Sequence, residues 1–70
     1  MIFSKKSMPL IERLLAANAV EGDAISELNS YMSGSNIESK RLNELIDRST
    51  RAHNEKMDIW QRLQAEAIGN

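Results

Sequence analysis

Glycine and proline are rare in this sequence of 70 residues, and they leave two long stretches almost uninterrupted. Pro9 stands near the start, Gly22 and Gly34 lie inside the chain, and Gly69 is next to last. Proline is tolerated in the first turn of a helix, and glycine favours its end. The spacing predicts a single small all-α domain, with a flexible arm over residues 1–7, one helix over 8–32, a turn over 33–36 and a second helix over 37–67.

The first stretch carries a helical repeat that continues across Gly22. Steps of three and four residues link a set that is mainly apolar: Ile11, Leu14, Asn18, Glu21, Ile25, Leu28 and Met32. This unbroken phase predicts one continuous helix. Gly22 followed by Asp23 is also a suitable stop and N-cap, so a break there, giving three helices, is the alternative.

The strongest boundary is the segment around Gly34. Gly34 suits the left-handed position that ends a helix, and Ser35 with Glu38 has the spacing of a capping box. If the chain folds back here as an antiparallel hairpin, facing residues have numbers that sum to about 70. The polar intervals of the two helices then lie level and form a polar waist, with Asn18, Glu21 and Gly22 opposite Ser49, Thr50, Ala52 and His53.

A chain of this size needs stabilisation beyond its own core, because small domains bury little of their surface. Cysteine is absent and His53 is the one histidine, which excludes disulfides and argues against a metal site. We therefore expect the hairpin to be completed by oligomerisation into a helical bundle. The expected partner or oligomer interface consists of Leu10, Ile11, Leu14, Tyr31, Met57, Ile59, Trp60 and Leu63, although core packing of Trp60 against Ile11 and Leu14 is an alternative.

Charge and hydropathy exclude several classes of protein. The formal net charge is −1, which lacks the basic field of most nucleic-acid binders. No apolar stretch approaches the roughly 18 residues that span a bilayer. Ile2 and Phe3 precede Lys5 and Lys6, the reverse of the order in a signal peptide. We therefore expect a cytoplasmic protein that binds neither membranes nor nucleic acids.

Catalytic motifs are lacking, so we expect no enzymatic activity, no catalytic residues and no cofactor. His53 near Glu21 and Asn18 could act as a base with an orienting carboxylate, but a structural role is the simpler interpretation. Ser39 and Asn43 have a spacing that resembles the Ser-x-x-x-Asp motif of the small sporulation aspartyl-phosphate phosphatases, which are also helical hairpins. Asn43 stands where that family has its acidic residue, so the resemblance does not imply the activity.

A second candidate site is an anion-binding patch of Arg48, Thr50, Arg51 and His53. Arginine forks match the geometry of phosphate, and hydroxyl groups add hydrogen-bond donors. Asp47 and Glu55 each stand four residues from Arg51, so a solvated, ion-paired face is the alternative. A polar network between subunits that fixes their register is the third possibility.

The sequence thus favours a non-enzymatic helical interaction protein that works by oligomerisation or partner binding, as an adaptor, co-chaperone, inhibitor or structural subunit. In size and architecture it resembles helical-hairpin co-chaperones and needle subunits of type III secretion, and small bacterial and phage accessory proteins often have this form. The alternative is an oligomer that sequesters a phosphorylated, nucleotide-like ligand at the polar waist.

Overall fold

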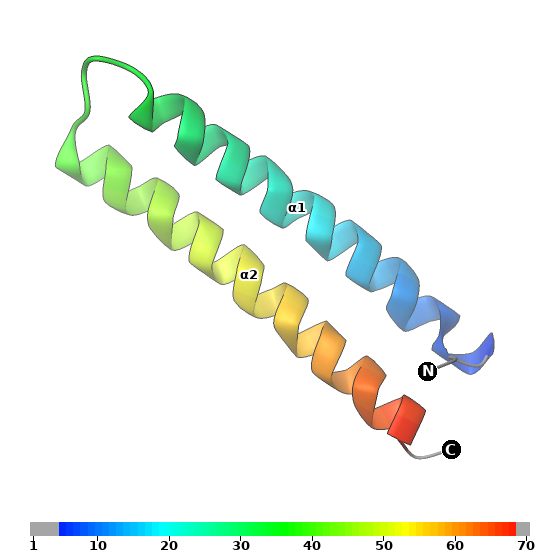
Figure 1. Ribbon diagram of the computed structural model, residues 1–70. Coiled ribbons are helices and arrows are strands. Elements are labelled where there is room, and N and C mark those ends of the chain that lie inside the picture. Colours follow the sequence, from blue (N-terminus) through cyan, green and yellow to red (C-terminus); the bar gives the residue numbers. More distant parts are fainter. Residues whose placement is uncertain (1–4, 69–70) are drawn as a thin grey trace.

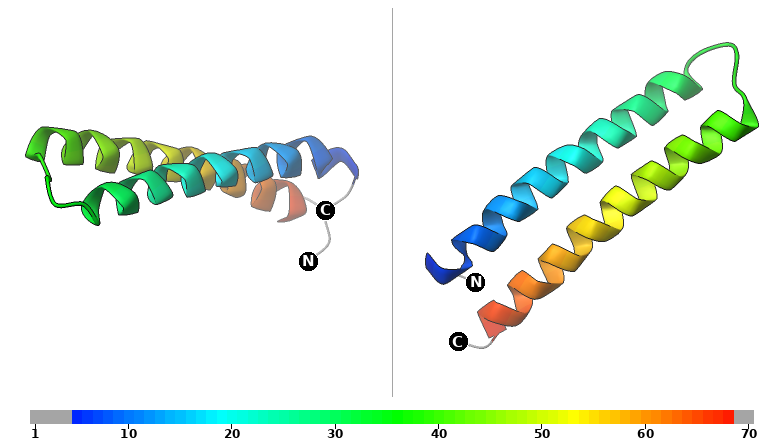
Figure 2. Two further views of the ribbon diagram at one scale, coloured as in Figure 1. Left: turned by 90° about the horizontal axis from the view of Figure 1, so that it is seen from above. Right: turned by 180° about the vertical axis from the view of Figure 1, so that it is seen from behind.

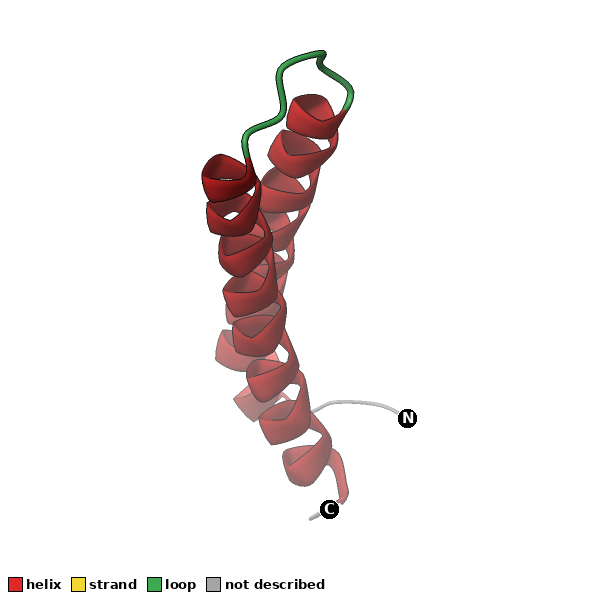
Figure 3. Ribbon diagram, turned by 90° about the vertical axis from the view of Figure 1, so that its left-hand side faces the viewer, coloured by secondary structure: helices red, strands yellow, loops and turns green. Residues whose placement is uncertain are grey.

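The computed structural model describes residues 5–68, with side chains up to residue 66. A short 3-10 turn, η1 (Lys5–Ser7), leads into α1 (Met8–Met32), and α2 (Ser39–Ile68) returns beside it in the opposite direction (Figure 1). Helices and loops make up all of the described part of the chain (Figure 3). The all-α hairpin that the sequence predicts is therefore confirmed. Within the described residues, neither helix is both long enough and apolar enough to cross a membrane.

The hairpin is a single layer of two long helices that cross at a shallow angle (Figure 2). Its Cα atoms extend over 52 × 16 × 14 Å, with a radius of gyration of 15.8 Å. A compact chain of this length has a radius of gyration of about 11 Å. Each helix therefore has one face against its neighbour and the rest of its surface open.

Helix α1 is continuous through Gly22, so the three-helix alternative is wrong. Glycine destabilises a helix interior by about 1 kcal/mol relative to alanine. Packing offsets this cost, because Glu21 and Ala24 on either side of Gly22 are both buried against α2. Pro9 lies in the first turn of α1, where its missing N–H costs no hydrogen bond.

The loop between the helices differs from the predicted turn. Gly34 does not adopt a left-handed conformation, because no described residue has a positive φ. Its N–H donates to the Tyr31 carbonyl at 3.1 Å, and a Cβ on Gly34 would lie only 3.3 Å from that oxygen. A side chain at this position would therefore crowd the Tyr31 carbonyl, whereas the handedness of the backbone places no demand on the residue.

Helix α2 starts at Ser39, two residues later than expected. Ser35 is consequently too far upstream to form the predicted capping box. The Tyr31 hydroxyl takes over part of this role, because the Glu38 N–H donates to it at 2.8 Å. A side chain of α1 thus fixes the start of α2.

The helices meet along two sets of buried or half-buried residues, which we call the seam. Alternating steps of three and four define it as Leu10, Leu14, Ala17, Glu21, Ala24, Leu28 and Tyr31 on α1, and Leu42, Leu45, Ser49, Ala52, Lys56, Ile59 and Leu63 on α2. Ile25 and Met32, which belong to the helical repeat of the first stretch, lie outside the seam and are exposed. The small side chains of Ala17 and Ala24 let the helices approach closely, and the larger Ile25 and Met32 then lie beside the seam and not within it.

Contacts between the helices fix their register about one helical turn from the prediction. Ser7 meets Glu66, Glu21 meets His53, and Glu27 meets Arg48. The loop extends to Glu38 and so accounts for part of this shift.

The N-terminal arm expected over residues 1–7 is partly structured. Ser7 is buried, and its hydroxyl donates to Glu66 Oε2 at 2.8 Å, which ties the start of α1 to the end of α2. Residues 1–4 of the expected arm lie outside the described residues.

Candidate functional site

The polar waist centres on Glu21, whose side chain is only 7% exposed. Two basic side chains of α2 reach it from across the seam. Lys56 Nζ pairs with Oε1, and His53 Nδ1 lies 2.5 Å from Oε2. Lys56 Nζ also lies 3.5 Å from Asn18 Oδ1. The predicted pairing of Glu21 with His53 at one level is confirmed, but Glu21 itself is buried in the seam and not solvated as a simple polar surface would be.

Electrostatics hold Glu21 in its charged form. The hydrogen bond from Lys56 is the main influence that lowers the pKa of Glu21 below its ordinary value of 4.5, and burial opposes it by disfavouring the charge. The hydrogen bond from His53 adds to the lowering. A slip of one helix along the other would separate this buried acid from the two basic side chains of the opposite helix, so the contacts favour the observed register.

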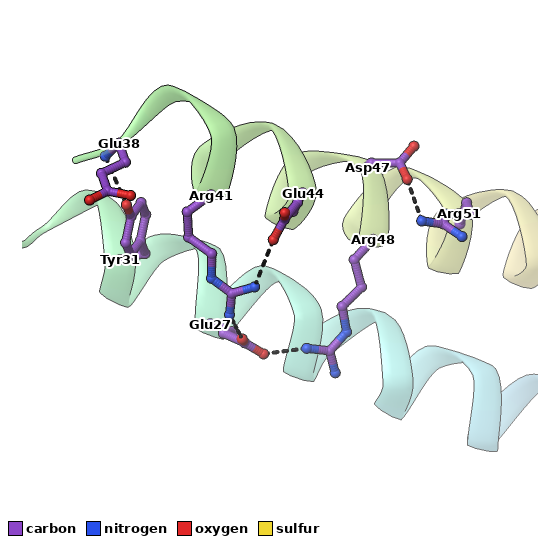
Figure 4. A network of polar contacts seen from close by, with 8 residues as sticks. All are labelled: Glu27, Tyr31, Glu38, Arg41, Glu44, Asp47, Arg48 and Arg51. Carbon is purple, nitrogen blue, oxygen red and sulfur yellow. Dashed lines mark hydrogen bonds and ion pairs between the residues drawn. The ribbon is translucent and has the colours of Figure 1, made fainter.

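The four residues of the expected anion-binding patch do not converge on one point. Arg48 reaches across to Glu27 on α1, whereas Arg51 turns to Asp47 on its own helix (Figure 4). His53 belongs to the waist, and Thr50 is exposed. The Asp47 pair with Arg51 is the four-residue ion pair that the sequence suggested.

Glu27 carries a second basic partner, because Arg41 Nη2 lies 3.0 Å from its Oε1 (Figure 4). Arg41 also pairs with Glu44 at 3.3 Å. Exposed pairs of this kind contribute up to about 1 kcal/mol each. Among the described residues, no three His, Cys, Asp or Glu side chains cluster as metal ligands.

The expected interface residues separate into two groups. Ile59 and Leu63 are buried in the seam, and Leu10 and Tyr31 are half-buried there, so the hairpin itself uses them. Trp60, Met57 and Ile11 instead line an open groove of about 340 Å³, together with Leu15, Asn18 and the seam residues Leu14 and Lys56.

The groove belongs to a larger surface that we call the apolar face. Steps of three and four from Ile11 along α1 give Leu15, Asn18, Gly22, Ile25, Asn29 and Met32, and the same steps along α2 give Ile46, Thr50, His53, Met57, Trp60 and Gln64. Leu15 is 67% exposed, and Ile25, Met32 and Ile46 are 42%, 45% and 44% exposed. None of these positions holds a lysine, arginine, aspartate or glutamate.

The opposite side of the hairpin is the charged face. It carries Arg13, Asp23 and Glu27 of α1 and Arg41, Arg48, Glu55 and Arg62 of α2. A hollow of about 220 Å³, smaller than the groove of the apolar face, lies between Arg13 and Glu55 of the charged face and is lined by Val20 and alanines. The two faces of the hairpin therefore differ sharply in charge.

Leu15, Ile25, Met32 and Ile46 of the apolar face are not among the site residues predicted from the sequence. A usable signal was present, because Ile25 and Met32 repeat at the same steps as Ile11. Ala17 and Ala24, which lie in the seam, carry no comparable signal in the sequence.

Comparisons with known proteins add no assignment: no family model matches the sequence, and neither the curated proteins nor the solved structures include a match.

Proposed function

We propose that this protein is a small non-enzymatic helical interaction protein, an adaptor, co-chaperone, inhibitor or structural subunit, that works by covering its apolar face against another helical surface. A cytoplasmic location is part of the same proposal. The observation that supports binding to another helical surface is the apolar face itself. Seven apolar side chains lie along it, and none of its positions holds a lysine, arginine, aspartate or glutamate. Lys56, which also lines the groove, pairs with Glu21.

The composition of the apolar face supports the proposal. Protein interfaces are depleted of charge at their centres and enriched in tryptophan and methionine, and contiguous exposed apolar patches mark interaction sites. Trp60 and Met57 line the groove here, and Trp60 is the only tryptophan of the chain. A large aromatic side chain at the edge of a groove is a typical anchor for binding.

The alternative, sequestration of a phosphorylated ligand at the waist, has no such support. Arg48, Arg51 and His53 are each engaged with a different carboxylate. A phosphate would have to displace Glu27, Asp47 or Glu21 to reach them. We therefore favour the interaction protein.

Site-specific photo-crosslinking in cells of the source organism tests the proposal. One chain carries a photoreactive phenylalanine analogue in place of Leu15 on the apolar face. The control carries it in place of Val20, which is 51% exposed on the charged face. We expect a discrete adduct, with a second copy or with another protein, from position 15 and not from position 20. No adduct from position 15, or the same adducts from both positions, would overturn the proposal.

A further inference from the structure

Resting on the proposed function, we propose that the partner on the apolar face is a second copy of this chain. The two hairpins pack face to face about a two-fold axis, with their loops at opposite ends, and form a four-helix bundle. The exposed area, the length of the hairpin, the register of the apolar residues and the shape of the face all favour this arrangement.

The hairpin exposes too much surface for its mass. A folded monomer of 7.9 kDa exposes about 4,400 Å², whereas this chain exposes 5263 Å². The excess of roughly 850 Å² matches the ~800 Å² that each partner buries in a standard interface. One partner of similar footprint therefore accounts for the excess.

The length of the hairpin suits a bundle of twice its mass. A compact protein of 140 residues has a radius of gyration of about 14 Å, close to the 15.8 Å of this single hairpin. A second hairpin placed on the apolar face adds thickness without adding length. Two copies would thus have the proportions of a compact four-helix domain.

One two-fold axis brings the apolar residues of both helices together. The midpoint between Leu15 and Ile25 is residue 20, so an axis at that level sets Leu15 of one copy opposite Ile25 of the other. The midpoint between Ile46 and Trp60 is residue 53. Glu21 and His53 are in contact, so residues 20 and 53 lie at nearly the same level of the hairpin. The same axis therefore also sets Trp60 opposite Ile46 of the second copy.

The shape of the apolar face favours opposite ends for the loops. The groove lies in the half of the hairpin away from the loop, between Leu15 and Trp60. The half near the loop instead presents the exposed side chains of Ile25, Met32 and Ile46. An antiparallel arrangement places these exposed side chains of each copy over the groove of the other, whereas loops at the same end would place groove on groove.

The waist makes this contact compatible with charge. His53 is the titratable residue among the positions of the apolar face, and it lies at the axis. Its ring nitrogen contacts Glu21 of its own chain, and the Lys56 ammonium pairs with the same carboxylate. The centre of the interface is otherwise uncharged, with Asn18 facing Gly22 of the second copy and Thr50 facing Met57.

A spin-label distance measurement tests the arrangement. The chain has no cysteine, so Ser35→Cys in the exposed loop introduces a single labelling site. Light scattering of the labelled chain should give twice the 7.9 kDa mass, and the label separation should approach the 52 Å length of the hairpin. Loops at the same end would bring the labels within about 20 Å, given helix spacings of 8–10 Å, and would overturn the proposal.

Matched charge substitutions test the face. We expect Leu15→Glu to raise the dissociation constant of the dimer by about 100-fold or more, because it buries an unpaired charge. Val20→Glu on the charged face should leave the constant unchanged. Equal effects of the two substitutions would overturn the proposal.

The mass measurement also separates the two proposals. A stable monomer at all concentrations, or a larger oligomer, would overturn the second-copy arrangement. If such a monomer still formed an adduct with another protein from position 15 alone, the proposed function would stand and only the identity of the partner would change.

Discussion

Two leucines of this chain provide a matched test of the fold, because the same truncation should have different consequences at each. Leu63 is 1% exposed in the seam, and Leu15 is 67% exposed on the apolar face. Truncation of a buried leucine to alanine costs 2.7–5.0 kcal/mol in a well-packed core, so we expect Leu63→Ala to cost about 3 kcal/mol. A chain of this length has a total stability of about 4–10 kcal/mol, so the variant would lose a large part of it.

Leu15→Ala should depend on protein concentration. In an isolated hairpin the change should cost less than about 0.5 kcal/mol, the usual value for a surface site. When a second copy covers the apolar face, burial of Leu15 contributes about 1–2 kcal/mol per chain, given 1.5–3 kcal/mol for a fully buried leucine. This loss should therefore appear at high concentration and vanish at low concentration.

Urea unfolding followed by circular dichroism provides the assay for both variants. Measurements at about 1 µM and about 200 µM separate the contribution of association from that of the seam. An unchanged slope with urea would show that the same cooperative transition is compared. Equal losses at Leu15 and Leu63 at low concentration, or a loss under about 1 kcal/mol for Leu63→Ala, would refute the assignment of the seam.

Three further predictions concern the waist, the loop and the candidate anion patch. Because folding lowers the pKa of Glu21 below 4.5, the ionised Glu21 contributes its full stabilisation above that pH, and this stabilisation is lost as the pH falls through the lowered pKa. Urea midpoints measured between about pH 6 and pH 3 should therefore fall less for Glu21→Gln than for the wild type. Tyr31→Phe removes the acceptor of the Glu38 N–H and should cost about 1 kcal/mol, with faster hydrogen exchange of that N–H; unchanged exchange would contradict the cap. Nucleoside triphosphates should not shift the melting temperature, because Arg51 is already paired; a shift that Arg51→Ala abolishes would revive the sequestration hypothesis.

The hairpin and the level of its waist could be predicted from the sequence, because both depend on local signals. Helical spacing and the positions of Pro9 and Gly34 separate the two helices. The polar intervals of the helices lie level once the chain folds back, and the contact of Glu21 with His53 confirms this. The prediction of two helices with a polar waist between them therefore holds even though the predicted register was wrong by about one helical turn.

The seam and the loop could not be predicted, because both depend on contacts between the helices. Alanine is small and only weakly apolar, so it does not mark a contact face in the sequence, yet Ala24 and Ala52 are buried where the helices approach each other. The larger Ile25 then remains outside and becomes part of the apolar face. The start of α2 depends on a hydroxyl from Tyr31, a contact that exists only after the chain has folded back.

The most direct test of an apolar face covered by a second copy is the mass of the wild-type chain in solution across a dilution series, with the emission of Trp60 recorded on the same samples. We expect twice the 7.9 kDa chain mass at high concentration. On dilution the mass should fall, and the emission should shift to the red as Trp60 loses its cover. A single-chain mass at every concentration, with full helicity and an unchanging Trp60 emission, would contradict coverage of the apolar face by a second copy.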